Sequence, residues 1–100
     1  MTSKITRSAN GQPCEMRIPN VCNFDPATTV LAHIRRGGIA GIGQKPSDLC
    51  SVYACSDCHD AIDRRSNTGA ATASEMDRYI LEGHLRTLIK LVSQGLITIN

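Results

Sequence analysis

The hydrophobic positions change their period along the chain, and these changes divide it into predicted elements. Residues 28–34 (TTVLAHI) and 49–55 (LCSVYAC) are short runs rich in β-branched and apolar residues, which is typical of strands. Four glycines lie between residues 37 and 43 and predict a long loop between these strands. The segment SDCHDAIDRR, which begins at Ser56, predicts a short helix. This part of the chain therefore has the order strand, loop, strand, helix.

The clearest predicted helix runs from about Ser74 to Gln94. Its apolar residues recur at helical spacing: Met76, Ile80, Leu81, Leu85, Leu88, Ile89 and Val92. Ser74, with Asp77 three residues later, resembles a capping box, and Gly95 is suited to the C-terminal stop. We expect this helix to serve packing and assign it no chemistry. The apolar segment LITI that follows predicts an additional edge strand.

The length of 100 residues predicts one α+β domain over residues 13–100, after a polar, flexible leader over residues 1–12. Aromatic residues make up only 3% of the chain and there is no Trp, so the core is modest and a bound metal would usefully add stability. The net charge of +2 does not by itself indicate a polyanionic partner. No run of 18 apolar residues and no signal-peptide pattern occurs, so we expect a cytoplasmic location.

Five cysteines in a reducing compartment favour metal ligands over disulfides. Cys55 and Cys58 have two-residue spacing and lie where a strand gives way to a helix, which lets both sulfurs face one point. Cys14 and Cys22 are separated by seven residues, but a Pro-Asn turn between them would bring them together. Zinc prefers four such ligands in a tetrahedron, so we predict a structural Zn²⁺ on these four cysteines.

Other interpretations of the cysteines stay open. A redox-active Cys-x-x-Cys would also lie at a helix N-terminus, although it usually belongs to a thioredoxin-like βαβ unit that the pattern lacks. His59, directly after Cys58, would alternatively replace one cysteine in the zinc shell. Cys50 lies within a predicted strand, where a cysteine usually acts as a small buried apolar residue.

The histidines suggest different chemistry. His59 and Asp63 are four residues apart on the predicted short helix, share one face and could bind an ion together. His33, on the preceding strand, can reach the same place if the strands pack on that helix. A neutral histidine beside a metal ion can activate water against a phosphodiester, and Arg35 and Arg36 could hold phosphate oxygens. Taken singly, each residue also fits a structural role, such as a partly buried histidine or a solvated arginine.

The segments LAHI and DLCSVYACSDCHDAID resemble the HNH, or ββα-metal, nucleases with a treble-clef zinc site. More narrowly, CEMRIPNVC, TTVLAHIR, KPSDL and ACSDCHDAIDRR resemble small prophage-encoded proteins of the YbcO type, to which nuclease activity is ascribed. The resemblance covers about residues 12–95. It implies that His33 is the general base, that His59 and Asp63 hold a catalytic divalent ion, and that the four paired cysteines form the structural zinc shell.

Two positions depart from the HNH pattern. The residue before the base is often Asp or His and helps to hold the catalytic metal, but here it is Ala32. The Asn that orients the base in many members has no clear counterpart near Cys50, and Asp48 is a nearby substitute.

The leading hypothesis is a metal-dependent endonuclease that acts on nucleic acid, with DNA as the expected substrate. Its second divalent ion would be Mg²⁺, Mn²⁺, Ni²⁺ or Zn²⁺, and Arg35, Arg36 and Lys45 would position the phosphate backbone. The alternative, motivated by Ala32, is a zinc-stabilised nucleic-acid-binding module without catalysis. A third hypothesis is a protein-interaction domain that uses the long helix.

Overall fold

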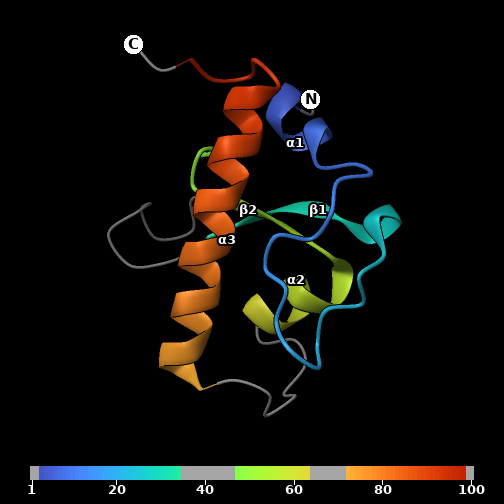
Figure 1. Cartoon of the computed structure of the whole chain (residues 1–100), viewed down its shortest axis with the longest axis vertical. Helices are drawn as coiled ribbons and strands as arrows, with labels where there is room; N and C mark the ends of the chain where they lie inside the picture. The colour runs from blue at the N-terminus through green and yellow to red at the C-terminus, as the bar shows by residue number, and fades with distance from the viewer. Residues whose placement is uncertain (1–2, 35–46, 64–71, 99–100) are drawn as a thin grey trace.

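A computed structural model describes residues 3–34, 47–63 and 72–98 of the chain. The elements follow in the order α1 (Lys4–Ser8), the 3₁₀ turn η1 (Pro26–Thr28), β1 (Val30–His33), β2 (Ser51–Ala54), α2 (Ser56–Ile62) and α3 (Ala73–Ser93). In Figure 1, α3 runs along one side of the β1–β2 hairpin, with α1 beside its C-terminal half and α2 farther toward its N-terminal half. This arrangement confirms the predicted α+β class, and both strands fall inside their predicted ranges. No described helix has the length and apolar character needed to cross a membrane.

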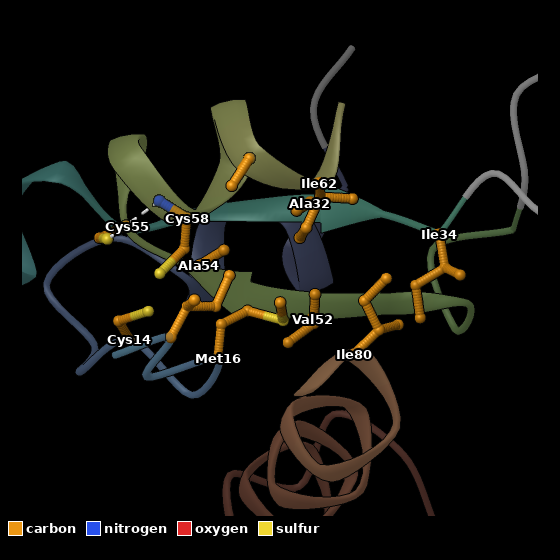
Figure 2. Packing of buried hydrophobic residues seen from close by; sticks show 12 residues of the cluster. Cys14, Met16, Ala32, Ile34, Val52, Ala54, Cys55, Cys58, Ile62 and Ile80 are labelled. Carbon is orange, nitrogen blue, oxygen red and sulfur yellow. Dashed lines mark hydrogen bonds between the residues drawn. The ribbon is translucent and has the colours of Figure 1, made fainter. Parts of the chain in front are cut away.

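The antiparallel hairpin divides the core into two parts. Leu31 lies opposite Tyr53, and Ala32 lies opposite Val52. Because neighbouring side chains of a strand point to opposite faces, these pairs belong to different clusters. The larger cluster joins the hairpin to α2, the N-terminal half of α3 and the segment that carries Met16 and Ile18 (Figure 2). The smaller cluster joins Leu31 and Tyr53 to Ala9 and Leu91.

The outer edge of β2 is covered by α3 and by the segment around Glu15. The backbone N–H of Tyr53 donates to the Thr87 hydroxyl at 2.9 Å, and the Tyr53 carbonyl accepts from the Glu15 N–H at 2.8 Å. The ring of His84 donates from Nδ1 to the Ser51 carbonyl at 2.7 Å. These bonds satisfy backbone groups that would otherwise be an open sheet edge, and they fix α3 on the hairpin.

Glu15 is a buried acidic residue that sequence reasoning missed. Its carboxylate lies 2.9 Å from Arg17 and 3.7 Å from both Arg86 and Lys90. Arg86 also donates to the backbone carbonyl of Glu15. Three cations therefore compensate one carboxylate that is almost fully removed from solvent, and two of them come from α3. The contact joins the N-terminal third of the chain to the last helix.

Residues 3–12, expected as part of a polar leader, are folded onto the domain. They form α1, which contacts β1, and Ala9 is fully buried beside Tyr53. The Ser8 hydroxyl lies 2.6 Å from the Tyr53 hydroxyl. Only Ile5 and Ala9 supply an apolar contact from this segment, and two positions four residues apart are too few to reveal a helical period.

The start of α3 differs from the prediction in its cap. Thr72, rather than Ser74, is the N-cap: its hydroxyl accepts from the Glu75 N–H, and the Glu75 side chain accepts from the Thr72 N–H. The predicted stop at Gly95 is confirmed by its positive φ of 73°. The expected edge strand after it is not formed over residues 96–98, and the described sheet has two strands.

The face of α3 that is buried against the hairpin is not its most apolar face. Leu81, Leu85 and Ile89 are 57%, 50% and 70% exposed, although the period predicts that they pack. The helix instead rests on the hairpin through Ile80, Gly83, Thr87 and Leu91. The tight approach and the hydrogen bond to the β2 edge require a glycine and a threonine, which a hydrophobicity pattern does not identify.

Substitution of Gly83 tests this approach. A Cβ atom at this position would lie 2.7 Å from Val52 Cγ2 and 3.0 Å from the Glu15 carbonyl oxygen. Alanine normally favours a helix interior over glycine by about 1 kcal/mol. We expect the reverse sign here, with Gly83→Ala lowering the free energy of unfolding by about 1–3 kcal/mol because of overpacking. Thermal denaturation measures it, with the neighbouring Glu82→Ala as control, and a higher Tm for Gly83→Ala would contradict the close contact.

Candidate functional site

Four cysteine sulfurs meet at one end of the hairpin. The Sγ atoms of Cys14, Cys22, Cys55 and Cys58 all lie within 4.8 Å of one another. The sulfurs of Cys22 and Cys55 are 3.9 Å apart. Four thiolates around a tetrahedral ion with bonds near 2.3 Å require sulfur separations of about 3.8 Å. These residues can therefore hold a metal ion, and both the donor set and the spacing fit zinc.

Local backbone structure explains why the sulfurs converge. The N–H groups of Val21 and Cys22 both donate to the Ile18 carbonyl, and Asn20 has a positive φ of 63°. This turn brings Cys22 back toward Cys14. Cys55 is the N-cap of α2, and its sulfur accepts from the Cys58 N–H at 3.4 Å (Figure 2). The predicted Pro-Asn turn and the predicted strand-to-helix position of Cys55 are both confirmed.

The thiols of this cluster do not ionise independently. A hydrogen bond between the side chains of Cys14 and Cys58 lowers the pKa of Cys14 and raises the pKa of Cys58, because the Cys58 thiol stabilises the Cys14 thiolate. Burial raises the pKa of Cys22 to about 11. Four thiolates at this separation therefore need a cation, and binding of that cation would release protons.

His33 is paired with Asp48 at the far end of β1. Its Nε2 atom lies 2.7 Å from Asp48 Oδ1, and the two side chains are 10% and 26% exposed. A carboxylate can only accept, so Nε2 carries the hydrogen. In the neutral imidazole the lone pair is then on Nδ1, which is the atom able to accept a proton.

Hydrogen bonds extend from this pair into three other elements. The Ser51 hydroxyl donates to the Asp48 carbonyl at 2.5 Å, and the Ser51 carbonyl accepts from His84 of α3. On the other side, the Ser3 hydroxyl donates to Asp48 Oδ2 at 2.5 Å. Sequence reasoning missed Ser3, Ser51 and His84. Serines are common and His84 is far from Asp48 along the chain, so these residues form no recognisable spacing pattern with it.

His59 and Asp63 form the contact that their four-residue spacing predicts. His59 Nε2 lies 3.2 Å from Asp63 Oδ2, and both side chains are partly exposed. Together they present one imidazole and one carboxylate at the C-terminal end of α2. This pair could contribute two ligands to an ion.

The four cysteines form the one group of three or more possible metal ligands with mutually close donor atoms among the described residues. The predicted base His33 and the predicted ligands His59 and Asp63 do not form a second group of this kind. Ala32 is fully buried in the larger core cluster and offers no ligand. Arg35, Arg36 and Lys45 lie outside the described residues. Cys50 is only partly buried and lies just before β2, outside the cysteine cluster.

Comparison with known proteins gives a consistent set of relatives. A family profile described as "Putative nuclease YbcO" matches residues 3–96. "Putative nuclease YbcO" of Escherichia coli (strain K12) is 47% identical over 94 residues, which cover 93% of this chain and 95% of the relative. "Putative nuclease ybcO" of Enterobacteria phage 82 has the same identity and coverage. A solved structure of a "putative bacteriophage protein" from Escherichia coli str. K-12 substr. MG1655 is 42% identical, with a TM-score of 0.75, and the match covers 90% of this chain and 98% of that one.

The cysteine cluster predicts that metal loading is coupled to folding. We expect removal of bound metal by a strong chelator to lower the Tm by at least about 10 °C, because four thiol groups, three of them buried, would lose their common ligand. Cys58→Ser should lose both the bound metal and the same stability, whereas Cys50→Ser should keep both. Calorimetry combined with metal analysis provides the measurement. An unchanged melting curve after demonstrated removal of the metal would refute the coupling.

Proposed function

Since the chain belongs to the YbcO family, we propose that it is a metal-dependent endonuclease of the HNH, or ββα-metal, type that hydrolyses phosphodiester bonds of DNA. The observation that supports this most directly is the His33–Asp48 pair, which leaves a proton-accepting nitrogen at the end of β1. The cysteine cluster is a separate structural zinc site in this proposal. The order of hairpin and following α2 agrees with a ββα core.

His33 acts as the general base. Its Nδ1 atom accepts a proton from a water molecule as the water oxygen forms a bond to phosphorus. The phosphorus–oxygen bond on the opposite side breaks, and the leaving oxygen takes a proton from solvent. Asp48 keeps the hydrogen on Nε2 and stabilises the imidazolium that forms. His33 then returns its proton to solvent and is ready for the next cycle.

His59 and Asp63 would hold the catalytic divalent ion. One imidazole nitrogen and one carboxylate oxygen suit Mn²⁺, Ni²⁺ or Zn²⁺, and Mg²⁺ would use mainly the carboxylate. Such an ion would supply Lewis-acid stabilisation of the leaving oxyanion. Because Ala32 provides no ligand, water and substrate phosphate would have to supplement these two protein ligands. Arg35, Arg36 and Lys45 position the DNA backbone.

Cleavage of supercoiled plasmid tests this function. We expect cleavage by the wild type with added Mg²⁺, Mn²⁺ or Ni²⁺, and a loss of about 10²–10⁴-fold in rate for His33→Ala, because the general base is removed. His59→Ala should raise the metal concentration needed for half-maximal activity. Glu82→Gln, prepared in the same way, is the control, since this residue lies on an exposed part of α3.

Equal cleavage by wild type and His33→Ala would contradict the assignment of the base. Absence of metal-dependent cleavage of plasmid, linear duplex, single-stranded DNA and RNA would contradict the nuclease function itself.

A second candidate function is favoured by the alanine at position 32, whose methyl side chain cannot bind a metal, so that His59 and Asp63 are the two protein ligands proposed for a catalytic ion. In this case the chain is a zinc-stabilised module that binds DNA without cleaving it. Binding would then survive His33→Ala and His59→Ala but fall with Arg35→Ala and Arg36→Ala, and it would weaken steeply with salt. Fluorescence anisotropy with a labelled duplex, run beside the plasmid assay, distinguishes the two functions.

A further inference from the structure

The carboxylate of Asp48 is shared between two elements that are far apart in the sequence. Its Oδ1 atom faces His33 of β1, and its Oδ2 atom faces the first turn of α1. On the α1 side, the Ser3 hydroxyl lies at 2.5 Å and the Thr6 hydroxyl at 3.5 Å. A separation of 2.5 Å is typical of a charge-assisted bond from a hydroxyl to a carboxylate.

Ser3 has two tasks at once. Its oxygen accepts from the Thr6 N–H at 3.0 Å and so caps α1. Its single hydroxyl hydrogen is directed to Asp48, which is its closer oxygen neighbour, while Thr6 Oγ1 lies 3.0 Å away. The cap therefore fixes the hydroxyl in space, and the hydroxyl in turn fixes one oxygen of the carboxylate.

We propose that Ser3, supported by Thr6, is a positioning residue that acts through Asp48 on His33, so that α1 is a working part of the candidate site. This inference rests on the proposed role of His33 as the base. The hydroxyl of Ser3 at Oδ2 restricts rotation of the Asp48 carboxylate about its side-chain torsions. This restriction helps to keep Oδ1 directed at Nε2 of His33, so that Nδ1 stays the proton-accepting atom.

The other contacts of Asp48 show what α1 adds to its orientation. Asp48 lies in the turn before β2, and its backbone is held by Ser51, whose carbonyl is in turn held by His84 of α3. These bonds place the main chain of Asp48 but leave the direction of its carboxylate to side-chain contacts. Ser3 supplies such a contact at Oδ2, the oxygen that does not face His33. The apolar contacts of Ile5 and Ala9 hold α1 against the hairpin and keep Ser3 in reach.

Two substitutions separate positioning from simple capping. Ser3→Thr keeps a capping oxygen and a hydroxyl donor. Ser3→Asp keeps a capping oxygen and suits a helix N-terminus, but it has no donor and sets a second carboxylate against Asp48. Ser8→Ala is the matched control in the same helix, since the Ser8 hydroxyl contacts Tyr53 and not Asp48. Long-range ¹H–¹⁵N spectra of the full chain report the tautomer of His33 without any need for activity.

We expect wild type, Ser3→Thr and Ser8→Ala to share the His33 ¹⁵N shifts of the Nε2–H tautomer. Ser3→Asp should shift the population toward the other tautomer and lower kcat about tenfold with little change in KM, because a bond to a charged group is lost. Wild-type ¹⁵N shifts and kcat in Ser3→Asp would overturn the inference. If no variant cleaves nucleic acid but His33 still responds to Ser3→Asp, the proposed function fails and the positioning of His33 by α1 stands.

Discussion

Four sulfur atoms in one small volume constrain most of this fold. Two of them come from a turn before β1, and two come from the first turn of α2. Because the four sulfurs lie within 4.8 Å of one another, the turn that carries Cys22 must lie close to the start of α2. The larger core cluster, which contains three of these cysteines, also contains Ala32, Ala54 and Ala61. The chain has one Phe, two Tyr and no Trp, and Phe24 is 75% exposed, so few large rings are buried. A metal ion shared by the cysteines would therefore contribute substantially to the stability.

The hairpin keeps this stabilising centre apart from the histidine–carboxylate pair. The cysteines lie where β2 gives way to α2, whereas His33 ends β1 and lies opposite Ser51, the first residue of β2. Because side chains alternate between the two faces of β1, Ala32 belongs to the larger cluster and Leu31 to the smaller cluster. Asp48 can then accept hydrogen bonds from Ser3 beside α1 and from the Ser51 hydroxyl of β2 without disturbing the sulfurs. Four-residue strands are enough to separate two centres that a linear motif presents as neighbours.

Much of the architecture could be predicted from local patterns. The strands, the spacing of Cys55 and Cys58, the Pro-Asn turn and the contact of His59 with Asp63 depend on residues close together in the sequence. The partners of His33 were less accessible. Only the resemblance suggests Asp48. Ser3 contacts Asp48, and His84 contacts the Ser51 carbonyl, through three-dimensional contacts that leave no period in the sequence.

The buried face of α3 and the burial of Glu15 also could not be predicted from the sequence, because both depend on contacts between distant parts of the chain. The wide apolar stripe of α3 predicts burial of Leu81 and Ile89, but a close backbone approach at Gly83 decides which side of the helix faces the hairpin. The burial of Glu15 likewise depends on cations that lie more than seventy residues later in the chain. A hydrophobicity pattern contains neither the distance between two backbones nor the position of a distant countercharge.

The contact between Glu15 and α3 has a consequence for the order of events during synthesis on the ribosome. All four clustered cysteines and both strands precede α3, so they can emerge and assemble while the last helix is still inside the exit tunnel. Until Arg86 and Lys90 emerge, the Glu15 carboxylate lacks two of its three cations, and the outer edge of β2 lacks Thr87 and His84. A nascent chain whose cysteines assemble before α3 emerges would have an uncovered strand edge, and association with other nascent chains would begin at that edge.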